Sequence, residues 1–283
     1  MKQDLKTLVS KVGDLPPMPV VAVKVMELMQ DPDTGADDLA KMIANDQAVS
    51  ARVLKIANSS FYSLQRQVKT LEHAIVILGE KTLRSLVLAS SLQSINKKFG
   101  LMEKMLWEDS MGCAIGARLT CLWFKTGDPE ESFLAGLFRH IGRMVMNNLD
   151  SAKFQAMVAE AYSEAVPLKD LEQQYFPFSH AQIGAAVLQK WNFSQSLINI
   201  VANHEELEEL AEDPVLQRLA ANVNIAEGLC RRLGIGRRFP EEGFDLTSLP
   251  GAAVLGVDSD QLEQLQEEFK SFFEKDREAF MGA

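Results

Sequence analysis

Cysteine, positive charge and long apolar runs are all scarce in this chain of 283 residues. Cys113, Cys121 and Cys230 are odd in number and have no C-x-x-C spacing, which disfavours a disulfide framework. Because all three fall in apolar helical patterns, we predict small core residues in a reducing compartment. No segment approaches the roughly 18 uncharged apolar residues that a bilayer-spanning helix needs. The N-terminus also lacks the apolar core of a signal peptide, so we expect a cytoplasmic protein without membrane contact.

Positive charge is too sparse for a nucleic-acid-binding protein. The 39 acidic residues outnumber the 29 basic ones, and the formal net charge of −10 repels phosphate backbones, so we expect no binding to DNA or RNA. The cluster of Arg231, Arg232, Arg237 and Arg238 fits a helix end, where cations suit the negative end of the helix dipole. The chain has no phosphate-binding glycine loop, no H-E-x-x-H and no G-x-S-x-G. These absences disfavour the common catalytic classes, and no cofactor is expected.

Helical spacing of apolar residues dominates the sequence and strand-like alternation is scarce, so we predict an all-α fold. An apolar stripe predicts a first helix that contains Leu5 and Val12 and ends at Gly13. The stretch from Gly234 to Gly256 is rich in glycine and proline and is predicted to be an irregular loop. Further helices are predicted at about 20–29, 81–92, 102–124, 131–147, 151–162, 195–206 and 215–233.

Several polar residues stand where helices should begin or end. Thr34, Asp46 and Thr70 are predicted to start helices, because their side chains can accept hydrogen bonds from free backbone amides. Ser179 and Gln182 form the best local signal, a capping box that begins a helix at His180. Asp258 and Gln261 are likewise predicted to cap the last helix. Its apolar stripe consists of Leu262, Leu265, Phe269, Phe272 and Phe273.

The chain is long enough for one large domain or two compact ones. Gly100 is a candidate hinge. We therefore predict two packed helical subdomains, an N-terminal bundle of residues 1–100 and a second subdomain of residues 101–283 that includes a C-terminal helical extension.

Histidine is the residue type most able to carry chemistry here. His140, His180 and His204 fall in the second half of the chain, at the ends or middles of separate helices. Side chains on facing helices can build metal sites, and three converging imidazoles would suffice for one zinc-like ion. The alternative is that each histidine is an ordinary core or surface residue, and the spacing alone does not separate these interpretations.

Several ordered motifs resemble those of the HDOD family between about residues 8 and 233. The segments that carry the resemblance are 15–19 (LPPMP), 43–48 (IANDQA), 54–62 (LKIANSSFY), 71–79 (LEHAIVILG), 135–143 (AGLFRHIGR), 180–185 (HAQIGA), 191–192 (WN) and 203–205 (NHE). HDOD proteins are bacterial and are related to the HD superfamily of metal-dependent phosphohydrolases, including the HD-GYP phosphodiesterases. The resemblance implies that the second subdomain is an HD-like helical bundle.

The adjacent His-Asp pair of the HD enzymes is absent from this chain. Arg139 stands where the histidine should be and His140 where the aspartate should be, while Asn203 replaces the first histidine of a His-His pair. A guanidinium has no lone pair to give a metal and adds repulsion beside a divalent cation. We therefore expect no two-metal hydrolysis, no catalytic residue and a vestigial pocket. That pocket would contain Arg139, His140, His180, His204 and Glu227.

Three uses of the vestigial pocket remain open. It can be a hydrogen-bonded core in which Arg139 pairs with a carboxylate such as Glu205. It can keep a three-histidine remnant of a metal site, formed by His140, His180 and His204. It can also bind an anion such as a nucleotide phosphate at Arg139.

The resemblance favours a non-enzymatic signalling module that binds partner proteins. HDOD domains occur beside receiver, GGDEF, EAL or kinase domains, so partners of those types are expected. The candidate interaction residues are Asn58, Ser59, Phe61 and Tyr62, although Asn58 and Ser59 could instead simply terminate a helix. The alternative functions are a divergent phosphohydrolase acting on a nucleotide or cyclic dinucleotide, and a nucleotide-sensing module.

Overall fold

The computed structural model describes residues 15–28, 35–62, 64, 66–92, 95 and 100–281, with Ala36 described in its backbone only. Every regular element in these ranges is a helix, which confirms the predicted all-α fold. None of the described helices combines the length and hydropathy that a membrane crossing requires. The predicted first helix and the predicted cap at Thr34 lie outside the described residues.

The chain divides into two compact units, and the division differs from the predicted one. The larger unit contains residues 15–17 and 100–262, and the smaller unit contains residues 18–95, with the gaps given above, and 263–281. The predicted boundary at residue 100 lies close to the end of segment 18–95 of the smaller unit. The predicted C-terminal extension, however, groups mostly with the smaller unit. The reason is aromatic packing: the Phe61 ring lies 6.0 Å from that of Phe272 and 6.5 Å from that of Phe280.

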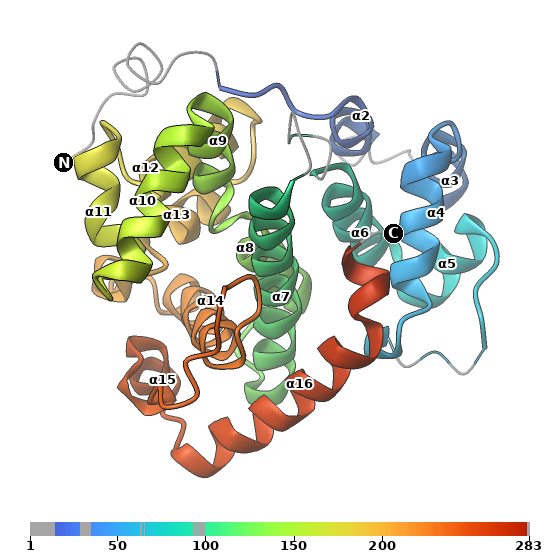
Figure 1. Cartoon of the computed structure of the whole chain (residues 1–283). Helices are drawn as coiled ribbons and strands as arrows, with labels where there is room; N and C mark the ends of the chain where they lie inside the picture. Colours follow the sequence, from blue (N-terminus) through green and yellow to red (C-terminus); the bar gives the residue numbers. More distant parts are fainter. Residues whose placement is uncertain are drawn as a thin grey trace. The chain divides into compact units, whose positions relative to one another are not determined.

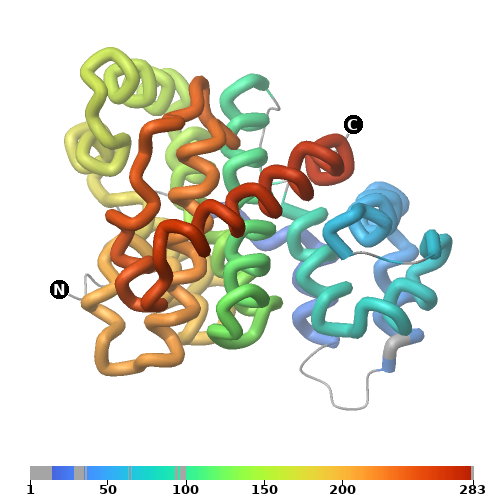
Figure 2. Tube along the Cα trace, turned by 90° about the horizontal axis from the view of Figure 1, so that it is seen from below, coloured from blue at the N-terminus to red at the C-terminus, as the bar shows by residue number. Residues whose placement is uncertain are grey.

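The smaller unit is a bundle of short helices (Figure 2). Two predicted helix starts in this unit are confirmed. The Asp46 carboxylate accepts hydrogen bonds from the amides of Ala48 and Val49, both at 3.0 Å, and the Thr70 hydroxyl accepts one from His73 at 3.2 Å. Its helices are α2 (Val20–Leu28), α3 (Ala36–Ala44), α4 (Gln47–Ala57), α5 (Leu71–Leu78), α6 (Glu80–Leu92) and most of α16 (Ser259–Met281).

The larger unit is built on α7, with α8 and α14 packed against it (Figure 1). The α7–α8 packing is close, because a Cβ atom on Gly136 would lie 2.5 Å from the backbone oxygen of Cys113. All three cysteines are buried and free, as predicted. The helices are α7 (Leu101–Phe124), α8 (Pro129–Phe138), α9 (Ile141–Leu149), α10 (Ser151–Ser163), α11 (Leu168–Tyr175), α12 (His180–Lys190), α13 (Gln195–Asn203), α14 (Pro214–Leu233) and α15 (Pro250–Leu255).

Two sequence predictions are wrong within this unit. The predicted loop from 234 to 256 contains α15, which begins at Pro250. The predicted continuous helix 131–147 is broken at Arg139 and His140, where the backbone of His140 leaves the helical region. Successive positions of a continuous helix point about 100° apart. The break instead lets the side chains of Arg139 and His140 both reach Asp109.

Candidate functional site

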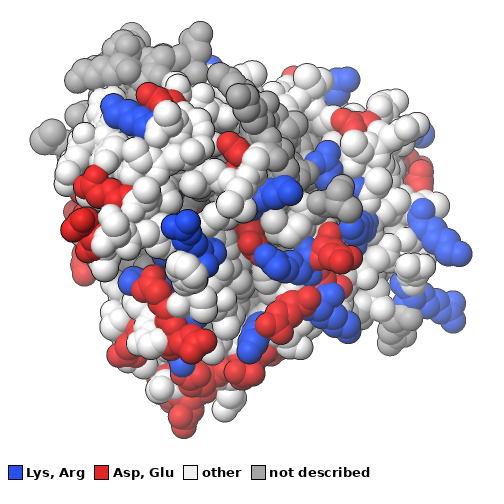
Figure 3. Space-filling view, in the orientation of Figure 1, with Lys and Arg blue, Asp and Glu red and all other residues white. Residues whose placement is uncertain are grey.

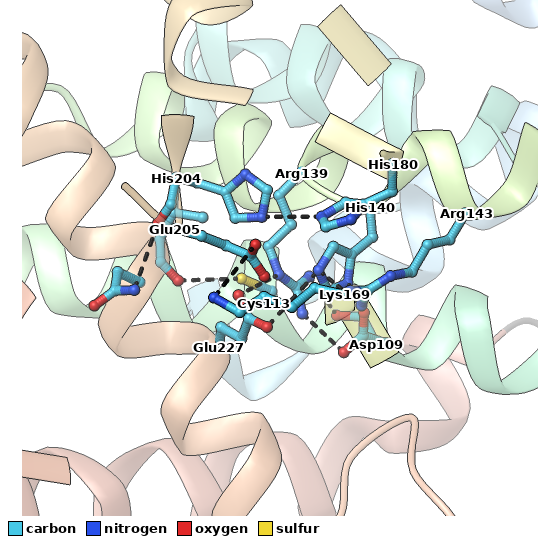
Figure 4. Close-up of polar contacts among 12 residues, drawn as sticks. Asp109, Cys113, Arg139, His140, Arg143, Lys169, His180, His204, Glu205 and Glu227 are labelled. Carbon is cyan, nitrogen blue, oxygen red and sulfur yellow. Dashed lines mark hydrogen bonds and ion pairs between the residues drawn. The ribbon is translucent and has the colours of Figure 1, made fainter. Parts of the chain in front are cut away.

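The vestigial pocket predicted from the sequence is a buried cluster of charged and imidazole groups in the larger unit (Figure 4). Arg139 and His140 come from the α8–α9 break, His180 from the first residue of α12, and His204 from the residue after α13. Glu227 comes from α14. The capping box that begins α12 is confirmed. The Gln182 side chain accepts from the Ser179 backbone amide at 3.0 Å, and the Gln182 backbone amide donates to the Ser179 hydroxyl at 3.3 Å.

Arg139 is fully buried, and its main partner is Asp109. The guanidinium donates to the Asp109 carboxylate at 2.8 Å and lies 3.7 Å from Glu227. Although burial opposes the charged form, its negative neighbours, Asp109 above all, raise the pKa of Arg139 above its ordinary value, so it stays a cation. The structure therefore pairs Arg139 with a carboxylate, as predicted, but with Asp109 rather than with Glu205, the example that the sequence suggested. Glu205 lies instead 3.8 Å from the half-exposed Lys169.

The structure brings His140, His180 and His204 together, with ring centroids 4.8 to 5.7 Å apart. All three are buried. In each ring Nδ1 contacts a hydrogen-bond acceptor. The partners are Asp109 for His140 at 2.7 Å, Glu172 for His180 at 2.6 Å and the Val201 carbonyl for His204 at 2.9 Å.

Burial and neighbouring charge keep two of these rings neutral. Burial is the largest cause that lowers the pKa of His140 well below its usual value, and the Arg139 and Arg143 cations add to it. Burial, followed by His180, lowers the pKa of His204 to about 3. A neutral imidazole whose Nδ1 carries the proton presents a lone pair at Nε2.

Arg143 and Glu172 support the cluster from the side. The Arg143 Nε donates to Glu172 at 2.9 Å, and a terminal nitrogen of Arg143 lies 3.0–3.1 Å from both ring nitrogens of His140. A position in the ring plane at those distances would overlap Cε1, so the guanidinium lies over the ring face. Burial raises the pKa of Glu172, but Arg143 and the bonds to His180 outweigh it and lower that pKa to about 2.

Sequence reasoning missed Asp109, Arg143 and Glu172. Asp109 carries one available signal, because it is the last charged residue before an uncharged run of α7 that ends at Arg118. A carboxylate at the start of a buried run needs a buried partner. Glu172 carries no such signal, since the sequence LKDLEQQY is typical of a solvated helix face.

The relation to HD enzymes implies a metal, and the donor set fits one kind of ion better than another. A two-metal centre for hard cations needs several free carboxylates, yet Asp109 is bonded to Arg139 and His140, and Glu172 to Arg143 and His180. Three imidazoles suit a single borderline ion such as Zn²⁺. Their candidate ligand atoms lie within 4.8 Å of one another.

A cavity of about 680 Å³ opens beside the cluster. Its wall is mixed, with apolar residues such as Met102, Phe154 and Phe244 next to charged ones. Figure 3 shows acidic and basic side chains interspersed on one face of the chain. The residues that the cavity shares with the cluster are Asp109, Arg143, Glu205 and Glu227.

The predicted interaction residues, in the smaller unit, offer little free surface. Ser59 and Phe61 are buried. The Asn58 amide donates to the carbonyls of Leu54 and Val68, both at 2.8 Å, and its oxygen accepts from the Val68 amide at 2.7 Å. These bonds match the alternative interpretation, in which Asn58 terminates a helix. A contact between this segment and a partner protein stays a prediction.

Comparison with solved structures defines the class of fold. The chain is similar to an HDOD domain protein of unknown function from Geobacter sulfurreducens, with a TM-score of 0.79 and 24% identity over 97% of this chain and 95% of that one. It is also similar to a candidate phosphohydrolase from Shewanella amazonensis SB2B, with a TM-score of 0.74 and 24% identity over 96% of both chains. At these identities the likeness shows the fold alone, a helical fold related to the HD fold.

Comparison of sequences then gives the family. The model of the HDOD domain matches residues 15–207, and the chain belongs to the HDOD family. A curated relative, an uncharacterized protein from Treponema pallidum (strain Nichols), is 23% identical over 225 residues. This match covers 77% of the present chain and 44% of that protein. A candidate signal transduction protein from Marinobacter aquaeolei VT8 has a TM-score of 0.67 and 19% identity, over 99% of this chain and 60% of that chain.

Proposed function

We propose that this chain is a cytoplasmic, non-hydrolytic signal-transduction module that acts by binding signalling proteins, of the receiver, GGDEF/EAL or kinase type. The observation that carries the proposal is the buried Arg139–Asp109 ion pair, with N–O contact at 2.8 Å. Arg139 stands where the resemblance to HD enzymes places a metal-binding histidine. A permanent cation there supplies no lone pair and repels a hard divalent ion.

The other charges in the cluster support the same proposal. Hydrolysis of a phosphodiester by an HD-type centre needs a water held on metal and a free carboxylate set to hold that metal. Asp109 and Glu172 each accept hydrogen bonds from an arginine and contact a histidine, so neither is free for that role. The remaining carboxylates, Glu205 and Glu227, are too few for a two-metal site.

The second candidate function is hydrolysis or sensing of a nucleotide. It is favoured by the cavity of about 680 Å³, whose lining includes Arg143 and Lys169 next to apolar and aromatic residues. Such a lining can accommodate a phosphate together with a base. The same wall carries Asp109, Glu205, Glu227 and Glu241, however, which offset the positive charge of its arginines and of Lys169.

The test is turnover of bis(p-nitrophenyl) phosphate by chain purified without chelators, assayed with Mg²⁺, Mn²⁺ and Zn²⁺ in turn. We expect no turnover above that of the His140→Ala variant. Metal-dependent turnover by the natural chain that is lost in His140→Ala would overturn the proposal. Parallel melting curves with nucleotides address sensing, because a ligand at about 100 times its Kd adds roughly 2.7 kcal/mol of stability.

A further inference from the structure

Two imidazoles at the centre of the cluster, those of His180 and His204, lie in direct contact. The Nε2 atoms of His180 and His204 lie 3.4 Å apart (Figure 4). The Nδ1 of His204 contacts a carbonyl oxygen, and that of His180 contacts Glu172, so both Nδ1 atoms must carry protons. The two Nε2 atoms therefore face each other in a buried site. Such a contact is favourable when a cation, either a metal ion or a proton, lies between the two atoms.

We infer that His140, His180 and His204 bind one divalent transition-metal ion, zinc in preference, with Glu227 as the fourth ligand that closes the site. Two nitrogens that each lie about 2.0–2.1 Å from a tetrahedral zinc ion are roughly 3.4 Å apart. This is the separation of the two Nε2 atoms. The Nε2 of His140 lies 3.8 Å from the Glu227 carboxylate, and the ligand atoms of His204, Glu205 and Glu227 form a second closely spaced group.

The contacts of the three Nδ1 atoms have the form found behind zinc-binding histidines. Such a histidine almost always donates its other ring N–H to a carboxylate or a backbone carbonyl, which fixes the ring and makes the metal-binding nitrogen more basic. Asp109, Glu172 and the Val201 carbonyl fill these three places at 2.6–2.9 Å. Arg143 does not block His140, because its guanidinium lies over the ring face and leaves the in-plane lone pair free.

The charges around the site also favour a divalent cation. Arg139 and Arg143 supply two buried positive charges against four carboxylates, which leaves two negative charges uncompensated when all are ionised. Lys169, with a side chain that is 48% exposed, lies 3.8 Å from Glu205 and is the nearest further cation that the described contacts show. The four carboxylates are those of Asp109, Glu172, Glu205 and Glu227.

A zinc site closed by four protein ligands is compatible with the proposed non-hydrolytic function. The inference partly rests on that proposed function. Structural zinc sites use four protein ligands, whereas catalytic sites keep one position for water. With Glu227 in the fourth position, the ion would hold α12, α13 and α14 to the α8–α9 break without activating water. Zinc occupancy would then be a state that a signalling module can report.

The probe is Co²⁺, added to the full-length, untagged chain after removal of metals by a chelator. Tetrahedral Co²⁺ gives strong visible absorption bands, and octahedral Co²⁺ gives weak ones. We expect strong bands that saturate at one equivalent per chain and disappear when one equivalent of Zn²⁺ is added. His204→Gln should weaken binding at least 100-fold. His73→Gln, which alters an exposed histidine of α5, should bind as the natural chain does.

Absent or octahedral bands, or equal binding by His204→Gln and the natural chain, would overturn the inference. Should His204→Gln fail to fold, the imidazole NMR signals of the natural chain decide: Zn²⁺ must shift those of three histidines and leave His73 unchanged. The competing occupant is a proton shared by His180 and His204, which would appear as an imidazolium signal that Zn²⁺ leaves unchanged. Phosphodiester turnover by the zinc-loaded chain would overturn the proposed function and leave zinc binding intact. Missing cobalt bands without turnover would overturn zinc binding alone.

Discussion

The histidine cluster of the larger unit and the segment Asn58–Tyr62 of the smaller unit are both rich in polar residues, and both were candidate functional regions. They differ in how their polar groups are satisfied. In the cluster, charged groups are matched with charged groups: Arg139 with Asp109 at 2.8 Å, and Arg143 with Glu172 at 2.9 Å. In the segment, the neutral amide of Asn58 hydrogen-bonds backbone atoms of α4 and of Val68, and a single carboxylate, Asp276, accepts from the Ser60 amide at 2.6 Å.

The difference separates a candidate site from a structural element. Buried charges carry a large desolvation penalty and are weak evidence of a gain in stability, so their retention in one place points to another use. Neutral side-chain bonds to backbone are the ordinary way to end a helix. The cluster is therefore the stronger candidate for chemistry, and the segment the stronger candidate for a purely structural role.

The largest expected effect follows from removing one charge of the cluster. Arg139→Met should lower the free energy of unfolding by about 3–5 kcal/mol, because Asp109 is left as a buried charge without its partner. Urea denaturation measures this loss. Lys169→Met, at the partly exposed pair with Glu205, is the matched control and should change stability by less than about 1 kcal/mol.

A double variant sharpens the same prediction. The loss of stability in the double variant Asp109→Asn, Arg139→Met should be smaller than the sum of the losses in the two single variants. The double variant removes both charges of the pair, so neither is left buried without the other. Additive losses would contradict the ion-pair account. Equal losses for Arg139→Met and Lys169→Met would remove the contrast between the cluster and an ordinary surface.

The second prediction concerns the packing that positions the histidines. A Cβ atom on Gly142 would lie 2.0 Å from the backbone oxygen of His180, so Gly142→Ala must push α9 and α12 apart. We expect a loss of about 3 kcal/mol in the free energy of unfolding. Gly243→Ala is the control, because nothing lies within 4 Å of a Cβ atom there. Equal midpoints of urea denaturation for the two variants would show that the close approach is relieved at little cost.

Much of the fold could be predicted from the sequence because its signals are local. Asp46, Thr70 and Ser179 each bond amides within three residues, so the cap and the helix that it starts lie in one short segment. The sequence did not predict which part of the chain the last helix packs against. Its apolar stripe indicates that one face is buried, and only the folded chain shows that Phe272 and Phe280 meet Phe61.

The candidate site, too, could be predicted only where its signals are local. The motifs singled out His140, His180 and His204 because each lies in a recognisable local pattern. Asp109 and Glu172 contact those histidines from other helices. The uncharged run after Asp109 indicates burial but names no partner, and Glu172 looks the same whether it faces water or a buried ring. The break at Arg139 was also hidden, because apolar spacing continues through it.

The smallest expected effect tests the structural interpretation of the segment. Asn58→Ala should lower the free energy of unfolding by about 1–3 kcal/mol, because the amide and the carbonyl of Val68 both lose their partner in a partly buried place. Asn203→Ala, which removes a single hydrogen bond from the side-chain amide to the Asn199 carbonyl on α13, is the matched control and should cost less. Hydrogen exchange should localise the loss to the Val68 amide. A folded Asn58→Ala chain of unchanged stability would return Asn58 to the candidates for partner binding, because its hydrogen bonds would then explain nothing about the fold.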